Sequence, residues 1–368
     1  MIDVCAPCLR RSFLIAHLAP RIAGLLTRRR GRRVAGLLAL PEDELLAVAA
    51  GRRIGEALAF LESFDADAER ERLDLPRAVA VCAHAESYPA LLGELDDPPA
   101  VLFGSGRHEA LDALREEPAV AVVGTRRASP YGAEVAYSLG RGLGASGVPV
   151  VSGLALGIDA TAHRGCLDGR GLPLAVLACG PDVAYPRRHR ALHARVREAG
   201  VVLSELPPGT APFLWAFPAR NRIMAGLARM TVVVEAAQPS GSLITSDFAR
   251  DLGRSVAAVP GRVTSRVAHG TNALLRDGAV PITGTEDVLD ELFGVDVRRL
   301  PEHARRAPEP EDPLLRAVLD AAEQSDSIDA ITERTGRGAA EVRAALGRLE
   351  VDGHLVRRAL GGWQRRAG

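Results

Sequence analysis

The sequence predicts an α/β protein with a parallel sheet covered by helices on both faces, a helical domain before it and a winged helix after it. Two observations support this fold class. Short apolar runs alternate with amphipathic segments of helical length between residues 75 and 295, which is typical of strand–helix–strand units. Residues 296–313 are charged and proline-rich, which indicates a linker before the C-terminal segment.

Composition indicates a folded protein with several domains. The chain has 368 residues, of which 47% are hydrophobic, and its formal net charge is zero. This length suits about two or three domains, and a neutral charge neither favours nor excludes nucleic acid as a partner. The chain contains no lysine. Any anion site must therefore rely on planar, bidentate arginine side chains.

The cysteines indicate a reduced, cytoplasmic protein. Their odd number and uneven spacing argue against a disulfide framework. They are Cys5, Cys8, Cys82, Cys166 and Cys179. Cys5 and Cys8 form a C-x-x-C pair, but no second pair follows at metal-ligand spacing, and His17 is a weak candidate for a third ligand. We therefore expect no metal and no cofactor. No long apolar run and no secretory signal pattern occurs, so we expect no membrane segment.

Residues 1–70 predict a small helical domain of the SAM or helix-hairpin-helix kind. The segment is rich in Leu, Ala and Arg, and its helical patterns are interrupted by proline and glycine. In "LPEDELLAVA" the acidic residues fall in the first helical turn, which the helix dipole favours. The basic run at residues 27–33 fits a solvated turn or a phosphate contact, and both interpretations stay open.

Residues 75–295 predict the parallel sheet. The apolar strands are bounded by turn residues, and most are separated by helical patterns, as in sheets with both faces covered. The predicted strands are residues 120–124, 148–153, 174–179, 201–206, 231–236, 255–260 and 279–283.

Residues 314–368 predict a winged helix. Three helical patterns follow one another, and Ser327 and Gly336 are suited to begin and end the second helix. The segment "HLVRRALGGWQRR" then fits two short strands around Gly361 and Gly362.

The loops after four predicted strands are rich in Gly, Ser, Thr and Arg. They read "TRRASPYG", "LALGIDATAHRG", "GPDVAYPRRHR" and "AQPSGSLITSDFA". Glycine allows backbone N–H groups to approach an anion, and the following helices add positive dipole ends. Ligands of such sheets bind beyond the carboxyl ends of the strands. The sequence therefore predicts a row of phosphate sites, which suits a polyanion better than one nucleotide.

Two arginines flank an asparagine in "FPARNRIMAGL", residues 217–227. We expect a helix to begin in this segment, which places Arg220 and Arg222 near its positive end, where cations are unfavourable. An anionic ligand would resolve this conflict. The alternative is that both arginines pair with carboxylates such as Glu205 or Glu235. The neighbouring loops favour the ligand.

Common enzyme motifs do not occur in the sequence. There is no G-x-G-x-x-G after the first strand, no G-x-x-x-x-G-K-[ST] and no G-x-S-x-G. Asp159 and His163 lie one helical turn apart, a spacing that fits an acid–base pair or, more often, a structural contact. We expect a protein that is not an enzyme.

The order of these motifs resembles the DNA-processing protein DprA, or Smf, family over most of the chain. The matching segments include "VVGTRRASPYG", "VVSGLALGIDATAHRG", "AVLACGPDVAYPRRHR", "FPARNRIMAGLA", "VVVEAAQPSGSLIT" and "GTNALLRDGA". The resemblance implies an extended Rossmann-like fold that binds and protects incoming single-stranded DNA. It also implies loading of the recombinase RecA during natural transformation, and a homodimer formed through the Rossmann-like domain.

The resemblance also implies which residues bind the single-stranded DNA or its phosphates. They come from the first loop, the second loop, the arginine segment and the Ser-Gly loop. They are Gly124, Thr125, Arg126, Ser129, Ser152, Gly153, Gly157, Phe217, Arg220, Asn221, Arg222, Ser240, Gly241 and Ser242. The sequence departs from the family at Leu156, where arginine is frequent, and at Thr125, where serine is common.

Two other functions fit parts of the pattern. One is a Rossmann-like nucleotide N-glycosidase, but the "PGGxGTxxE" loop of such enzymes does not occur here. The other is a transcription regulator that binds DNA through the winged helix and senses nucleotides through the large domain.

Overall fold

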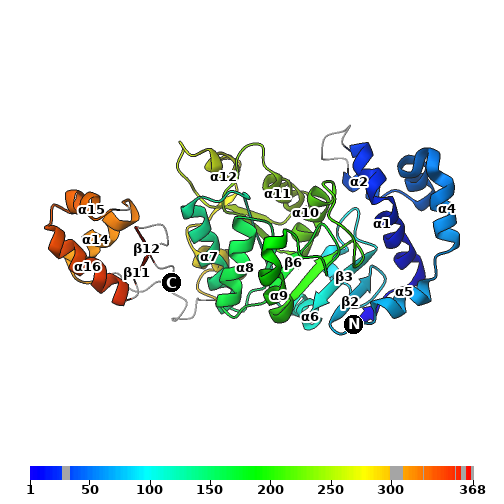
Figure 1. Cartoon of the computed structure of the whole chain (residues 1–368), viewed down its shortest axis with the longest axis horizontal. Coiled ribbons are helices and arrows are strands. Elements are labelled where there is room, and N and C mark those ends of the chain that lie inside the picture. Colours follow the sequence, from blue (N-terminus) through cyan, green and yellow to red (C-terminus); the bar gives the residue numbers. More distant parts are fainter. Residues whose placement is uncertain (27–33, 299–309, 326, 353, 358–361, 366–368) are drawn as a thin grey trace. The chain divides into compact units, whose positions relative to one another are not determined.

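The computed structural model describes all residues except 27–33, 299–309, 326, 353, 358–361 and 366–368. The chain forms two compact units, Met1–Leu300 and Pro301–Gly368 (Figure 1). The N-terminal helices therefore belong to the same compact unit as the sheet. No described helix has both the length and the apolar character needed to cross a membrane.

The first unit is built on a sheet of ten strands in the order β1-β2-β3-β7-β6-β5-β4-β8-β9-β10. The strands are β1 Ile2–Asp3, β2 Ala78–Cys82, β3 Val101–Gly106, β4 Val120–Val123, β5 Val150–Ser152, β6 Pro173–Val176, β7 Val201–Ser204, β8 Met230–Val233, β9 Ser255–Ala258 and β10 Val280–Pro281. The seven strands from β4 to β10 are parallel, which confirms the predicted parallel sheet.

The sheet continues beyond the predicted strands through β1, β2 and β3. Strand β3 is antiparallel to both β2 and β7, and β1 pairs in parallel with β2. The sheet is therefore mostly parallel, with an antiparallel extension at one edge. The sequence analysis missed these strands because no strand–helix–strand alternation marks them.

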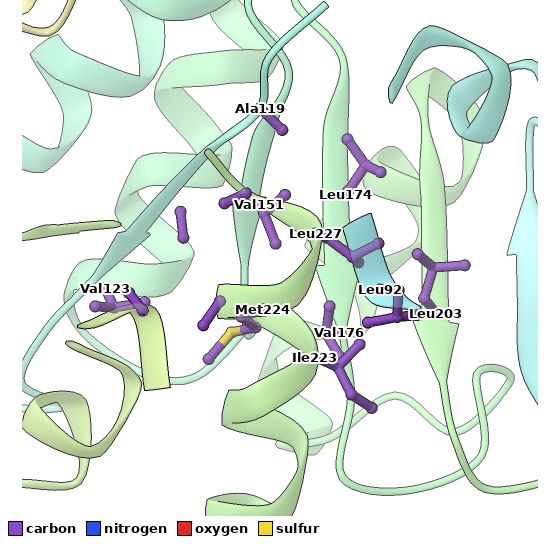
Figure 2. Packing of buried hydrophobic residues seen from close by; sticks show 14 of the residues in the cluster. Leu92, Ala119, Val123, Val151, Leu174, Val176, Leu203, Ile223, Met224 and Leu227 are labelled. Carbon is purple, nitrogen blue, oxygen red and sulfur yellow. The ribbon is translucent and has the colours of Figure 1, made fainter. Parts of the chain in front are cut away.

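Alternate side chains of the strands face the two helical layers, as the period of a strand requires. Val120 and Val122 of β4 pack with one layer, whereas Ala121 and Val123 pack with the other. On the second side α10 covers the centre of the sheet. Figure 2 shows its Ile223, Met224 and Leu227 among strand residues that include Val151, Leu174 and Val176.

Both layers are helical. The first layer contains α7 Pro130–Ala145, α8 Ile158–Asp168, α9 Arg190–Ala199 and α13 Thr285–Phe293. The second contains α6 Glu109–Glu116, α10 Ala216–Leu227, α11 Gly241–Asp251 and α12 His269–Arg276. Short helical turns lie at Ala90–Leu92, Arg187–His189 and Arg266–Ala268.

The N-terminal helices lie beside the β2–β3 edge (Figure 1). They are α1 Ala6–Leu26, α2 Val34–Leu38, α3 Glu42–Leu45, α4 Ile54–Glu62 and α5 Ala66–Leu73, with helical turns at Leu46–Ala50 and Gly51–Arg53. Leu14, Leu18 and Ile22 of α1 share a core with Trp215, whose Nε1 donates a hydrogen bond to the Ala19 carbonyl (3.1 Å).

The second unit is the predicted winged helix. It contains α14 Pro313–Glu323, α15 Ile328–Thr335, α16 Ala339–Val351 and the antiparallel pair β11 Leu355–Arg357 and β12 Trp363–Arg365. The Ser327 hydroxyl caps α15 by accepting from the Ala330 N–H (3.2 Å), and Gly336 ends the helix in a left-handed conformation (φ 62°). Both cap predictions are confirmed.

Candidate functional site

The strand order of the parallel sheet reverses between β4 and β8. Strands β5, β6 and β7 follow β4 on one side, whereas β8, β9 and β10 lie on the other. The loops after β4 and β8 therefore diverge, which opens a crevice at the carboxyl edge where α/β proteins bind ligands.

A pocket of about 380 Å³ lies in this crevice. This volume is within the range of small-ligand sites. Its lining brings together much of the predicted site. The lining residues are Val123, Gly124, Thr125, Arg126, Ala155, Asp159, Phe217, Pro218, Arg220, Asn221, Met224, Ser240, Gly241, Ser242, Ile244 and Thr245.

Arg126 is the exposed cation of this pocket. Its guanidinium carbon lies 4.9 Å from the centre of the Phe217 ring, a cation–π distance. The Tyr185 ring lies 5.5 Å from that of Phe217 and is 41% exposed. These three side chains line a smaller adjoining cavity of about 60 Å³. They form an accessible aromatic surface beside a positive charge.

Arg220 lines both cavities, but most of its guanidinium contacts are with other groups of the protein. Its Nη1 donates to the carbonyls of Gly153 (2.8 Å) and Val176, and its Nη2 lies 3.7 Å from Asp159 Oδ2. Burial lowers the pKa of Arg220 from its ordinary value. A Cβ on Gly153 would lie 2.0 Å from the guanidinium, so this glycine makes room for Arg220.

The structure contradicts the prediction that Arg222 contacts a phosphate. Arg222 is 1% exposed, and its guanidinium forms two hydrogen bonds with Glu205 (2.6 and 3.0 Å). Its Nε lies 3.0 Å from Asp97 Oδ1. Burial opposes the charged form, but both carboxylates outweigh it and raise the pKa of Arg222. Arg222 is therefore a buried ion-pair residue, which is the alternative that the sequence left open.

The predicted conflict between these two arginines and the helix dipole is small in the structure. Helix α10 begins at Ala216, so Arg220 and Arg222 lie beyond its first turn. The influence of the dipole on a side chain is strong only within the terminal turn. Their position therefore creates little conflict with the dipole.

The N-terminus of α11 forms another wall of the pocket. Ser240 caps the helix, and its hydroxyl lies 2.8 Å from that of Ser242. Asn221 Nδ2 donates to the Gly241 carbonyl (3.0 Å), which joins α10 to this helix end. Free N–H groups and the positive dipole end make such a terminus suited to an anion.

Thr245 lies one turn further along α11 and lines the same pocket. It is fully buried, and its hydroxyl has no hydrogen-bond partner among the described residues. A buried hydroxyl without a partner is unfavourable unless a ligand or water satisfies it. The sequence analysis missed this residue, although the helical repeat from Gly241 places it on the same face.

Besides Arg222, three predicted residues do not line either cavity. Ser129 caps α7, and its hydroxyl donates to Glu235 Oε1 (2.5 Å). Ser152 is fully buried and donates to the Val122 carbonyl (2.7 Å). Gly157 has a positive φ of 76° and packs against the backbone after Thr125. The structure gives Ser129 and Ser152 capping and packing roles in place of the predicted phosphate contacts, and Gly157 supports the first loop.

The possible acid–base pair is buried. His163 is fully buried, and burial lowers its pKa to about 3. Asp159 is 4% exposed and accepts a hydrogen bond from the Gly153 N–H (3.2 Å), and burial raises its pKa. Burial therefore keeps the His163 ring neutral at neutral pH. His163 does not line either cavity.

Comparison with known proteins identifies the family. The family model for DNA recombination-mediator protein A matches residues 79–293, and that for the DprA winged helix domain matches residues 302–361. The chain is 35% identical to protein Smf of Escherichia coli (strain K12) over 290 residues, which cover 77% of this chain and 76% of that protein. The chain belongs to the DprA (Smf) family.

Solved DprA structures share its fold. The X-ray structure of DprA from Streptococcus pneumoniae matches with a TM-score of 0.62 and 32% identity, over 79% of this chain and 99% of that one. A DprA structure from Helicobacter pylori, described in terms of its single-stranded DNA binding mode, matches with a TM-score of 0.52 and 29% identity. That match covers 59% of this chain and 96% of that one. The predicted Rossmann-like architecture is thus shared with solved DprA structures, and the family model identifies the C-terminal segment as the DprA winged helix domain.

Proposed function

We propose that this DprA-family protein binds single-stranded DNA in the crevice between the β4 and β8 loops and acts there as a recombination mediator. The observation that supports this most is the pocket of about 380 Å³, which joins Arg126 and the α11 N-terminus within one crevice. The described binding mode of the Helicobacter pylori relative supports the choice of ligand.

Each part of the crevice suits one part of a DNA strand. The Arg126 guanidinium and the backbone N–H of Gly241 line the crevice and can donate hydrogen bonds to phosphate oxygens. The exposed Tyr185 ring, beside the half-buried Phe217 ring, offers a surface on which a base can stack. Gly124, Thr125, Asn221 and Ser240 shape the crevice, whereas Arg220 holds the second loop.

This mode of binding predicts little preference for DNA sequence, because phosphates and stacking faces are common to all nucleotides.

We further propose that the bound DNA strand is protected and passed to the RecA recombinase in the cytoplasm. A homodimer formed through the Rossmann-like unit would align two such crevices. Both steps depend on the binding of single-stranded DNA in the crevice, and they are rejected if that binding is rejected.

The test is a pair of neighbouring arginine variants. Arg126 lines both cavities, whereas Arg127 is exposed and lines neither. Binding of a fluorescent oligonucleotide is measured by anisotropy over a range of salt concentrations. Arg126→Ala should weaken affinity about 5- to 30-fold, equivalent to about 1–2 kcal/mol, whereas Arg127→Ala should bind nearly as the parent.

Salt dependence gives a second readout. The log–log slope of affinity against salt should be on the order of −0.7 for each phosphate neutralised, and Arg126→Ala should reduce its magnitude by roughly one such step. A flat salt response, or equal effects of the two variants, would reject the crevice as the DNA site.

A further inference from the structure

Four potential metal ligands meet at the junction of the N-terminal helices and the sheet. Cys5 directly precedes α1 and Cys8 lies in its first turn, whereas Cys82 ends β2 and His84 follows it. The ligand atoms of all four lie within 4.8 Å of one another. Residues about eighty positions apart in the sequence are thus brought to one point by the fold.

The separations fit a tetrahedral zinc ion. His84 Nδ1 lies 3.5 Å from Cys5 Sγ and 3.3 Å from Cys8 Sγ. Zinc bonds of ~2.3 Å to sulfur and ~2.0–2.1 Å to nitrogen, arranged tetrahedrally, place sulfur and nitrogen roughly 3.5 Å apart. Three thiolates and one imidazole are a common ligand set of structural zinc sites.

We propose that Cys5, Cys8, Cys82 and His84 bind one structural Zn²⁺ ion. The prediction of no metal rested on the absence of a second C-x-x-C pair and on His17 as a weak candidate for the next ligand. His17 instead stacks on Phe60, with ring centres 4.5 Å apart. The missing ligands are supplied by a C-x-H pair at the end of a strand that the sequence analysis did not predict.

The site would fasten the N-terminal helices to the sheet. Cys8 and Cys82 are buried in a small cluster with Leu9, Phe103 and Leu73, which joins α1 and α5 to β2 and β3. His84 is exposed, which leaves one side accessible to the entering ion. A closed set of four protein ligands suits a structural role rather than catalysis.

The experiment measures zinc in the full-length protein expressed with added zinc. We expect about one zinc per chain by mass spectrometry of the metal content. His84→Ala changes an exposed residue, so it should fold yet bind zinc at least about tenfold more weakly in competition with a chelator. Cys82→Ser should lose the ion, whereas Cys166→Ser, which removes a buried cysteine elsewhere, should retain it.

A second measurement does not depend on any variant. Replacing zinc by Co²⁺ in the intact chain should give the visible absorption of tetrahedral, thiolate-bound cobalt. The proposal is overturned if the parent protein binds neither ion. It is also overturned if His84→Ala binds zinc as tightly as the parent, or if intact-mass analysis finds Cys5 and Cys8 joined as a disulfide in the freshly purified chain.

Discussion

Two arginines that are two positions apart in α10 have different surroundings. Arg222 lies between Glu205 and Asp97 and is closed to solvent, whereas Arg220 reaches the wall of the pocket. The sequence shows the pair but not its partners, because Glu205 and Asp97 come from other segments. Glu205 was among the carboxylates considered, and only the fold decides which arginine it contacts.

Removing Arg222 should destabilise the protein. Arg222→Ala leaves the carboxylates of Glu205 and Asp97 buried without their cation, and breaking such a pair typically costs about 3–5 kcal/mol. Urea denaturation should show a lower midpoint for this variant. Arg127→Ala, at an exposed site, should change the unfolding free energy by less than about 0.5 kcal/mol. Equal stability of the two variants would contradict the buried ion pair.

His163 should make the protein sensitive to acid. Burial, with smaller effects from Arg220 and His189, holds its pKa at about 3, below the ordinary value of 6.5. Between these values the unfolded chain binds a proton that the folded chain does not, so stability is complete above pH 6.5 and falls as the pH decreases. The loss from this group should reach about 2 kcal/mol at about pH 5.

The measurement is the unfolding free energy at several pH values for the parent and His163→Gln. The variant is expected to be less stable near neutral pH because packing is lost, but its stability should decrease less on acidification. Identical pH slopes for the two proteins would show that His163 titrates as an ordinary histidine.

At the scale of elements, the pocket depends on the ends of α10 and α11. Asn221 of α10 donates to the backbone of α11, and both helices contribute to the wall of the crevice. The loops were predictable from their Gly, Ser and Arg content after each strand. Ser129 and Ser152 were misplaced because a loop sequence does not reveal which hydroxyls cap helices or turn inward.

Thr245 offers a test of the α11 wall. Thr245→Val keeps the shape and removes a buried hydroxyl without a partner, so folding stability should be unchanged or higher. If the hydroxyl meets DNA, affinity should fall about 2- to 10-fold. Thr231→Val is the matched control, because Thr231 of β8 also has a buried hydroxyl without a partner but does not line the pocket. A loss of folding stability in Thr245→Val would contradict this role. So would equal effects of Thr245→Val and Thr231→Val on the affinity for DNA.

The strands were predictable to different degrees. Short apolar runs alternating with helical patterns marked the seven strands from β4 to β10 correctly. Strands β2 and β3 were not predicted, because an antiparallel extension lacks the alternation of strands and helices from which the other strands were predicted. The same omission concealed the partners of Cys5 and Cys8.

At the scale of the whole molecule, the two units have separate cores. The winged helix forms its own hydrophobic cluster, which includes Leu319, Ile331 and Trp363. In its hairpin, Arg365 pairs with Glu323 (2.9 Å). Two further arginines of the same segment, Arg358 and Arg366, lie outside the described residues.

Removing residues 309–368 should therefore leave most of the affinity for single-stranded DNA. The first unit retains its own core and the entire crevice. We expect a change of less than about fivefold in an anisotropy titration, consistent with the loss of peripheral charge alone. Circular dichroism controls for folding of the shortened chain. Loss of nearly all binding would move the main site to the winged helix.

The central claim is that single-stranded DNA binds in the crevice between the β4 and β8 loops. Photocrosslinking tests this most directly. A single-stranded oligonucleotide that contains 5-bromouracil is irradiated with the full chain, and the linked peptides are sequenced by mass spectrometry. The crevice predicts links to Phe217 or Tyr185, whose rings face the cavity beside Arg126, and their loss when both residues are replaced by leucine. Links confined to residues 313–365 would contradict the account.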